Sequence, residues 1–300
     1  MQPQPRTLHR LEKIIVVFAL AFALALTIGF AQAAGPKRKA QPLPAEDAEH
    51  LFLRSNVALV QDAISGETVF SKNTGAVLPI ASITKLMTAL VLLDANVDLK
   101  QRVAVSSDDQ DLLKGTRSRL RPGAVLTRDE LLLIALMASE NRAASALART
   151  YPGGTDVFVR AMNAKAQTLG MRETRFADPT GLSPANVSSA RDLARLVLAA
   201  QQHPVIGQYS TRESATVYAL GRPLAYRNTN GLVRAAQWDI GLSKTGFISE
   251  AGRCLVMRVK MASRDLVVVL LDSWGKHSRI GDANRIRKWL ETSVLKGQRG

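Results

Sequence analysis

The sequence predicts a mixed α/β fold of the α+β type, with a mostly antiparallel sheet flanked by helices and an inserted helical subdomain. Strand-like runs occur near both ends of the folded part, over residues 56–75 and between residues 239 and 273. Helical signals dominate from residue 98 to about 204. Strands grouped apart from helices are typical of the α+β class. A hydrophobic content of 46% in 300 residues is enough to bury a large core.

The N-terminus predicts a secretory signal peptide over residues 1–33. Basic residues precede an apolar run that ends in the small-residue triplet Ala31-Gln32-Ala33. This layout predicts cleavage after Ala33 and a periplasmic protein. An uncleaved membrane anchor is the alternative, because residues 14–34 are long enough to cross a bilayer.

Residues 34–50 are rich in proline and charge, which favours a flexible linker before the fold begins at residue 51. We expect residues 51–97 and 213–300 to form the sheet-containing part and residues 98–212 the helical subdomain. The first sheet element is a hairpin that turns at Ser65-Gly66.

Capping signals mark three helices in the middle block. Thr127 stands three residues before Glu130, Thr155 precedes a run that stops at Gly170, and Ser189 opens an amphipathic run. After the last strand-like segments, we expect a terminal helix over DANRIRKWLETSVL.

The formal net charge is +15, and removing residues 1–33 leaves +13. A basic exported protein should be attracted weakly to anionic envelope surfaces. Nucleic acid is a poor candidate partner, because aromatic residues make up only 5% and the signal directs export. Cys254 is the only cysteine and reads as a buried small hydrophobe, and the four histidines show no metal-binding spacing. We expect no metal and no cofactor.

The helix-like segment ASITKLMTALVLLDA, residues 81–95, carries a polar pair where apolar residues dominate. Ser82 and Lys85 stand at i and i+3, so their side chains share one helix face. A serine becomes nucleophilic when a base takes its proton, and a lysine serves as that base when burial lowers its pKa. The free backbone NH at the helix start would point toward a developing oxyanion.

A Ser-x-x-Lys motif alone is weak, and it also occurs at Ser273 and Ser293. The stronger signal is the ordered set formed with two downstream motifs. Ser139-Glu140-Asn141 ends a strongly apolar helix, and Lys244-Thr245-Gly246 lies on a strand-like segment. Such a set is found in penicillin-binding proteins and related β-lactamases.

On these motifs the chain resembles the low-molecular-mass penicillin-binding proteins of the D-alanyl-D-alanine carboxypeptidase and endopeptidase family, over residues 51–290. The branch it resembles most is that of the periplasmic D-alanyl-D-alanine endopeptidases, of the penicillin-binding protein 7 type. The resemblance implies the DD-peptidase/β-lactamase-like fold. It also rests on the segments LPIASITKLMTAL, MASENRAASALA, TRFADPTGL, SSARDLARL, NTNGLV and SKTGFISEAGRCLV.

The resemblance implies a role for each catalytic residue. Ser82 would attack the carbonyl of a D-Ala peptide bond, with Lys85 as general base. Ser139 would relay a proton to the leaving amine. Asn141 would hold the substrate amide and Lys85.

It implies substrate-binding roles for the downstream motif. Lys244 would bind the carboxylate beside the scissile bond, helped by Thr245, and would lower the pKa of Lys85. Gly246 would let the strand accept substrate edge-on. The backbone NH of Phe247 would complete the oxyanion hole.

The expected partners are peptidoglycan peptide stems, and β-lactam antibiotics as covalent inhibitors. Cleavage of D-alanyl-diaminopimelate cross-links is the favoured activity, and trimming of pentapeptides by a carboxypeptidase is the alternative. Only 54 residues follow Gly246, so we expect neither an added β-rich C-terminal domain nor an amphipathic tail.

Two rival functions remain. A β-lactamase would need an efficient deacylating base, for which Glu173 is the residue to ask about. A non-catalytic wall-binding module would have no need of a buried serine and lysine pair.

Overall fold

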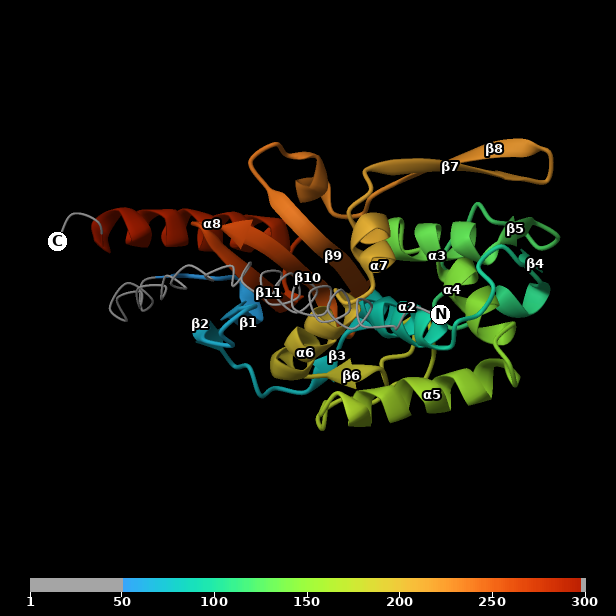
Figure 1. Cartoon of the computed structure of the whole chain (residues 1–300), viewed down its shortest axis with the longest axis horizontal. Coiled ribbons are helices and arrows are strands. Elements are labelled where there is room, and N and C mark those ends of the chain that lie inside the picture. Colours follow the sequence, from blue (N-terminus) through green and yellow to red (C-terminus); the bar gives the residue numbers. More distant parts are fainter. Residues whose placement is uncertain (1–50, 298–300) are drawn as a thin grey trace, which may run out of the picture. The chain divides into compact units, whose positions relative to one another are not determined.

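The centre of the fold is a five-stranded antiparallel sheet with the order β2-β1-β11-β10-β9 (Figure 1). The computed structural model describes residues 51–297, so the predicted signal peptide and linker lie outside the described residues. The sheet confirms the predicted antiparallel arrangement. Its strands are β1 (Ser55–Asp62), β2 (Thr68–Lys72), β9 (Asp239–Ile248), β10 (Gly252–Met261) and β11 (Arg264–Ser273).

The central strands are buried on both faces, and their side chains alternate between two cores. Val57 and Leu59 of β1 belong to the core under the helical block, whereas Ala58 and Val60 belong to a second core. This is the two-residue period of a strand. The second core is closed by α8 (Ser278–Gly297), whose apolar positions recur every three to four residues. Those contacts are Ala283, Ile286 and Leu290.

The other face of the sheet carries the remaining helices. They are α2 (Lys85–Asp94), α3 (Arg128–Met137), α4 (Asn141–Arg149), α5 (Gly154–Thr168), α6 (Ala190–Ala200) and α7 (Pro204–Ser210), with the 3-10 turns η2 (Ala81–Thr84) and η3 (Ser107–Asp109). The 3-10 turn η4 (Gly231–Arg234) lies on the α8 side, where Leu232 packs into the second core. The predicted caps at Thr127 and Ser189 form, each accepting a bond from the backbone NH three residues later.

Two predicted helix starts differ in detail from the structure. The segment expected to be one helix from residue 81 begins as η2 and becomes α-helical at Lys85. The helix expected after Thr155 begins at Gly154, with Gly153 as N-cap at φ +86°. The left-handed conformation there suits glycine, which explains why a serine or threonine cap is not used.

Three small two-stranded sheets complete the fold. They pair β3 (Leu78–Pro79) with β6 (Val187–Ser188), β4 (Arg102–Ala104) with β5 (Val125–Thr127), and β7 (Ser214–Ala219) with β8 (Arg222–Arg227). Strands β7 and β8 were not predicted from the sequence. Buried and exposed residues alternate along β7, as expected for a strand, but an alternation over only six residues is a weak signal in a sequence.

The helices and the single cysteine were also the subject of sequence-based expectations. Within residues 51–297, none of the helices combines the length and apolar character that a membrane span requires. Cys254 is buried in β10, and burial raises the pKa of its thiol to about 11. The thiol is therefore held in its protonated, unreactive form.

The capping box of α3 should contribute measurably to stability. In Thr127→Ala the backbone NH of Glu130 loses its acceptor at 3.1 Å, and we expect the free energy of unfolding to fall by about 1 kcal/mol. Urea unfolding followed by circular dichroism measures this. Thr168→Ala, at an exposed helix end, is the control and should change stability by less than about 0.5 kcal/mol. Equal losses in both variants would contradict the role of the cap.

Candidate active site

Lys85 is the most deeply placed of the predicted site residues. Its side chain is 1% exposed, and its Nζ lies 2.9 Å from Ser82 Oγ, 2.7 Å from Asn141 Oδ1 and 2.6 Å from the carbonyl oxygen of Thr180. A neutral amine has two hydrogens and one lone pair. The amide and carbonyl oxygens accept the two hydrogens, which leaves the lone pair for the Ser82 hydroxyl.

Burial lowers the pKa of Lys85 to about 7, against the charges of Asp178, Glu140 and Asp111, which raise it. Desolvation disfavours the ammonium form, and the three carboxylates limit that effect. The amine is therefore poised to accept a proton near neutral pH.

The junction between α3 and α4 supplies two more residues. Ser139 follows the last turn of α3 with φ +60°, a left-handed conformation that is uncommon for a serine. It turns the chain so that Asn141 opens α4, with Glu140 as N-cap. Asn141 spans the site, since its Oδ1 bonds Lys85 and its Nδ2 donates to Thr116 Oγ1 at 3.0 Å.

Strand β9 supplies the second buried lysine. Lys244 is 1% exposed, and its Nζ donates to Ser139 Oγ and to the carbonyl oxygen of Thr245, each at 2.9 Å. Burial lowers its pKa well below the usual value, and repulsion from Lys85 and Arg279 lowers it further. The charged groups that act on Lys85 are carboxylates, which raise its pKa, so a lowering of the Lys85 pKa by Lys244 stays a prediction. Burial is the largest cause at both lysines.

The rest of the β9 motif lies against the start of η2. A Cβ on Gly246 would stand 2.9 Å from the carbonyl oxygen of Ile80 and 3.1 Å from the backbone nitrogen of Ser82, so only glycine fits without displacement. Thr245 Oγ1 bonds Thr229 Oγ1 at 2.6 Å. The Phe247 side chain is 54% exposed under the guanidinium of Arg253.

The structure thus brings together the residues that the sequence placed on three separate segments. It also shows that the motifs at Ser82 and Lys244 touch through their backbones. The second Ser-x-x-Lys motif, Ser273 to Lys276, is not part of this site. Ser273 bonds Ser55 at the end of β11, and Lys276 is exposed.

The sequence did not predict that the loop containing Asp178 and Thr180 contacts Lys85. Asp178 accepts hydrogen bonds from the backbone nitrogens of Thr180, Gly181 and Ser183, and from the side chains of Thr180 and Asn186. This fixes the Thr180 carbonyl that contacts Lys85. The Asp178-Pro-Thr-Gly181 sequence is a turn signal that could have indicated a structured loop, although not its target.

Gly181 adds a second close approach to the nucleophile. It has φ +81°, and a Cβ there would lie 2.0 Å from the carbonyl oxygen of Ala81. Ala81 itself has φ +47°, a strained conformation for alanine. The loop and the start of η2 therefore hold each other in place.

Glu173, the residue considered as a deacylating base, is engaged elsewhere. Its carboxylate pairs with Arg191 at 3.7 Å, and its backbone NH donates to Asp192. These contacts lie in a cavity whose lining includes neither Ser82 nor Lys85. Among residues 51–297, no group of three or more histidine, cysteine, aspartate or glutamate side chains is arranged to hold a metal ion.

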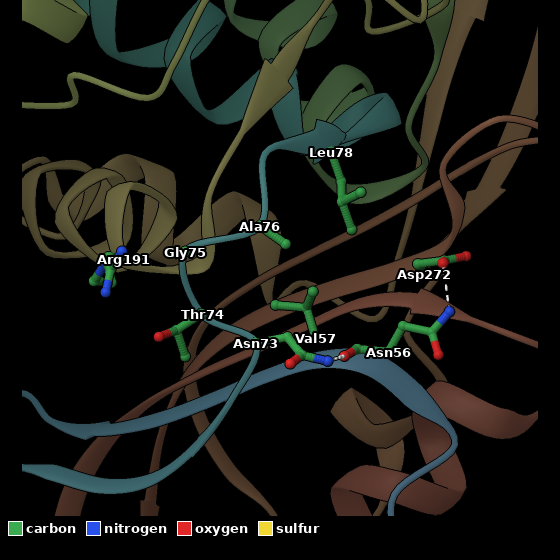
Figure 2. A pocket seen from close by; sticks show the side chains of 9 residues that line it. All are labelled: Asn56, Val57, Asn73, Thr74, Gly75, Ala76, Leu78, Arg191 and Asp272. Atoms are coloured by element: carbon green, nitrogen blue, oxygen red, sulfur yellow. Dashed lines mark hydrogen bonds between the residues drawn. The ribbon is translucent and has the colours of Figure 1, made fainter.

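A separate cavity of about 540 Å³ lies between the sheet and the start of α6, and Figure 2 shows the side chains that line it. Its polar side chains mostly bond one another: Asn56 donates to Asp272 at 2.6 Å, and Asn73 donates to the Asn56 carbonyl at 2.9 Å. None of the eight predicted site residues lines it.

Comparison with known proteins gives consistent results. Residues 44–275 match the family described as D-alanyl-D-alanine carboxypeptidase. The chain is 46% identical to a D-alanyl-D-alanine endopeptidase of Pseudomonas aeruginosa over 96% of this chain and 90% of that protein. It is 44% identical to a D-alanyl-D-alanine endopeptidase of Escherichia coli, covering 93% and 89%. A DD-transpeptidase of Streptomyces superposes with a TM-score of 0.74 at 25% identity, covering 80% and 98%.

The lowered pKa of Lys85 predicts a pH dependence of serine acylation. The second-order rate constant for labelling by a fluorescent penicillin should rise about tenfold per pH unit below pH 7 and level off above it, because only the neutral amine accepts the proton. The usual pKa of a lysine is 10.5, so between pH 7 and 10.5 the unfolded chain binds more protons at Lys85 than the folded protein does. The contribution of Lys85 to the free energy of unfolding therefore rises with pH in this range. Stopped-flow labelling from pH 5 to 9 measures the profile. A profile independent of pH would contradict this assignment.

Asp178→Asn should disturb the anchor of Lys85. An amide has only one acceptor oxygen, so it cannot accept all the hydrogen bonds that the backbone NH groups of Gly181 and Ser183 and their neighbours donate to the carboxylate. We therefore expect penicillin labelling of Ser82 to slow by roughly 100-fold. Glu173→Gln, in a neighbouring turn, should label at the wild-type rate. If both variants label at the wild-type rate, the loop does not position Lys85.

Proposed function

Because this chain belongs to the D-alanyl-D-alanine carboxypeptidase family of peptidases, we propose that it is a serine-type DD-endopeptidase that cleaves D-alanyl-diaminopimelate cross-links in peptidoglycan. The observation that carries the proposal is the buried Lys85 amine, which lies 2.9 Å from Ser82 Oγ with both of its hydrogens accepted elsewhere. A wall-binding module without catalysis would have no reason to retain this arrangement.

The first half of the reaction forms an acyl-enzyme. Ser82 Oγ attacks the carbonyl carbon of the D-alanine, and its proton passes to Lys85 Nζ. The backbone NH groups of Ser82 and Phe247 stabilise the oxyanion of the tetrahedral intermediate. When that intermediate collapses, the peptide C–N bond breaks, and the amine departs with a proton delivered through Ser139. The Ser82 ester remains.

Substrate is held from both sides of the cleft. Asn141 binds an amide of the donor peptide and keeps Lys85 oriented. Lys244, with Thr245, binds the carboxylate beside the scissile bond, and β9 receives the peptide along its edge at Gly246. In the second half of the reaction, water attacks the ester carbonyl, and Lys85 again accepts the proton of the attacking group. The D-alanyl carboxylate and free Ser82 result.

The relatives reported above support the endopeptidase activity over the carboxypeptidase activity. The relatives at 46% and 44% identity are both named endopeptidases, and each alignment covers more than nine-tenths of this chain. The catalytic residues themselves suit either activity, because both reactions break a bond after D-alanine next to a carboxylate. Trimming of pentapeptides is therefore the second candidate.

The proposal includes the setting in which the enzyme works. Residues 1–33 would direct export and be cleaved after Ala33, which would place the enzyme in the periplasm beside its substrate. β-Lactams would acylate Ser82 and inhibit the enzyme. Rapid hydrolysis of a β-lactam is not expected, because Glu173 is held by Arg191 in a cavity that excludes Ser82.

Muropeptide digestion tests the proposal directly. Residues 34–300 should convert cross-linked dimers to monomers while pentapeptide monomers persist, as followed by mass spectrometry. Ser82→Ala is the control and should lose essentially all turnover, since the covalent step disappears. Loss of one alanine from pentapeptides with intact dimers would favour the carboxypeptidase. Equal turnover by Ser82→Ala would exclude both.

A further inference from the structure

A cavity of about 530 Å³ opens next to the catalytic residues, on the side of Ser139 and Asn141. Its outer wall is formed by the loop carrying Arg117 and Arg119 and by strand β8, through Tyr226 and Arg227. The volume is within the range of small-ligand sites. Thr116 of this loop accepts a hydrogen bond from Asn141, but the arginines of the loop and the β7-β8 hairpin have no role in the chemistry described above.

The cavity is strongly basic. Arg117 and Arg227 are exposed, and no ion pair forms on either within residues 51–297. Arg119 lies 4.3 Å from the ring centre of Tyr226 and also bonds the carbonyl of Ala225. Glu140, which is 8% exposed, adds one carboxylate to the cavity lining and offsets part of the charge of the three guanidinium groups. Guanidinium groups presented together favour a carboxylate ligand.

Tyr226 provides a second, independent indication of a ligand. Its side chain is 2% exposed, yet its hydroxyl has no hydrogen-bond partner among the described residues. Buried polar groups are almost always paired, so an unpaired one needs an explanation. Burial, and then the charge of Glu140, raise the pKa of Tyr226 to about 12, so the hydroxyl keeps its proton and can donate it. The hydroxyl is closed off from solvent in the free protein, so a polar group in the cavity would become its partner once the neighbouring side chains shift.

The position of the cavity shows which part of a substrate would reach it. Ser139 lines the cavity and bonds Lys244, and these residues have the proposed roles of delivering a proton to the leaving amine and binding the carboxylate beside it. Asn141, which has the proposed role of binding the donor peptide, lines the cavity as well, so the cavity adjoins the cleft along the whole Ser139-Glu140-Asn141 segment, and the Ser139 end is the part next to the leaving group. A pentapeptide releases a single D-alanine, which ends at Lys244. A cross-link releases a whole stem peptide, which carries further carboxylates.

We propose that this cavity is a subsite for the leaving stem peptide of a cross-link, in which Arg117, Arg119 and Arg227 bind one of its carboxylates and Tyr226 donates to it. The inference rests on the proposed endopeptidase function and deepens it. It gives a physical source of preference for cross-linked substrate that the catalytic residues lack.

The test compares two substrates on matched variants. Arg117→Gln combined with Arg227→Gln removes two charges from the cavity. Arg121→Gln combined with Arg222→Gln removes two exposed charges from the same loop and the same hairpin, outside the cavity lining. For each protein, kcat/KM is measured on a cross-linked tetrapeptide dimer and on a monomeric pentapeptide, at low and high salt.

We expect the ratio of dimer to pentapeptide kcat/KM to fall about tenfold in the cavity variant and to stay at the wild-type value in the control. The difference should shrink at high salt. It should also be lost on a dimer whose leaving stem has amidated carboxylates. A cavity variant with the wild-type ratio would overturn the subsite while the endopeptidase activity stands. Wild-type protein that leaves dimers uncut would overturn the endopeptidase activity itself, and the subsite with it.

Tyr226→Phe separates binding from folding. It removes a hydroxyl that has no partner in the free protein, so the melting temperature should not fall, whereas the dimer to pentapeptide ratio should drop about threefold. A lower melting temperature with an unchanged ratio would show that the hydroxyl serves the fold and would overturn its part in the subsite.

Discussion

The active site depends on one buried amine whose pKa is lowered to about 7, so that its neutral form is available near neutral pH. A charged lysine in the position of Lys85 would need its solvation replaced, and the protein provides two carbonyl-type acceptors and one hydroxyl instead. Those three groups come from η2, from α4 and from the loop after α5. Each must reach the same point within a hydrogen-bond length. The packing of the helical block against the sheet is what brings them there.

The backbone around the amine is correspondingly tight. Gly246 and Gly181 both stand where a methyl group would collide with the chain just before Ser82. Ala81 and Ser139 adopt left-handed conformations that their side chains disfavour. Strain of this kind persists when surrounding contacts over-determine the geometry. Here the benefit is preorganisation, because the nucleophile and its base need little further ordering before reaction.

Much of the fold and of the candidate site could be predicted from local sequence patterns. The strand segments and the capping box at Thr127 were predicted correctly, and the three ordered motifs indicated the right family, because each depends on a few neighbouring residues. The loop at Asp178 and the hairpin formed by β7 and β8 were not, because their importance lies in contacts with residues about 100 positions away. Thr180 reaches Lys85 across 95 positions, and Arg119 reaches Ala225 across 106. No local signal encodes such a meeting.

The pairing of β1 with β11 has a consequence for how the chain acquires its shape. The first strand has its partner in the last one, and the backbone of Ser55 bonds Asp282, 227 positions later. Topologies dominated by such distant contacts fold slowly. The sheet therefore cannot close until almost the whole chain is available. The surroundings of Ser82 stay incomplete until then, since Lys244 and Gly246 arrive only with the final strands.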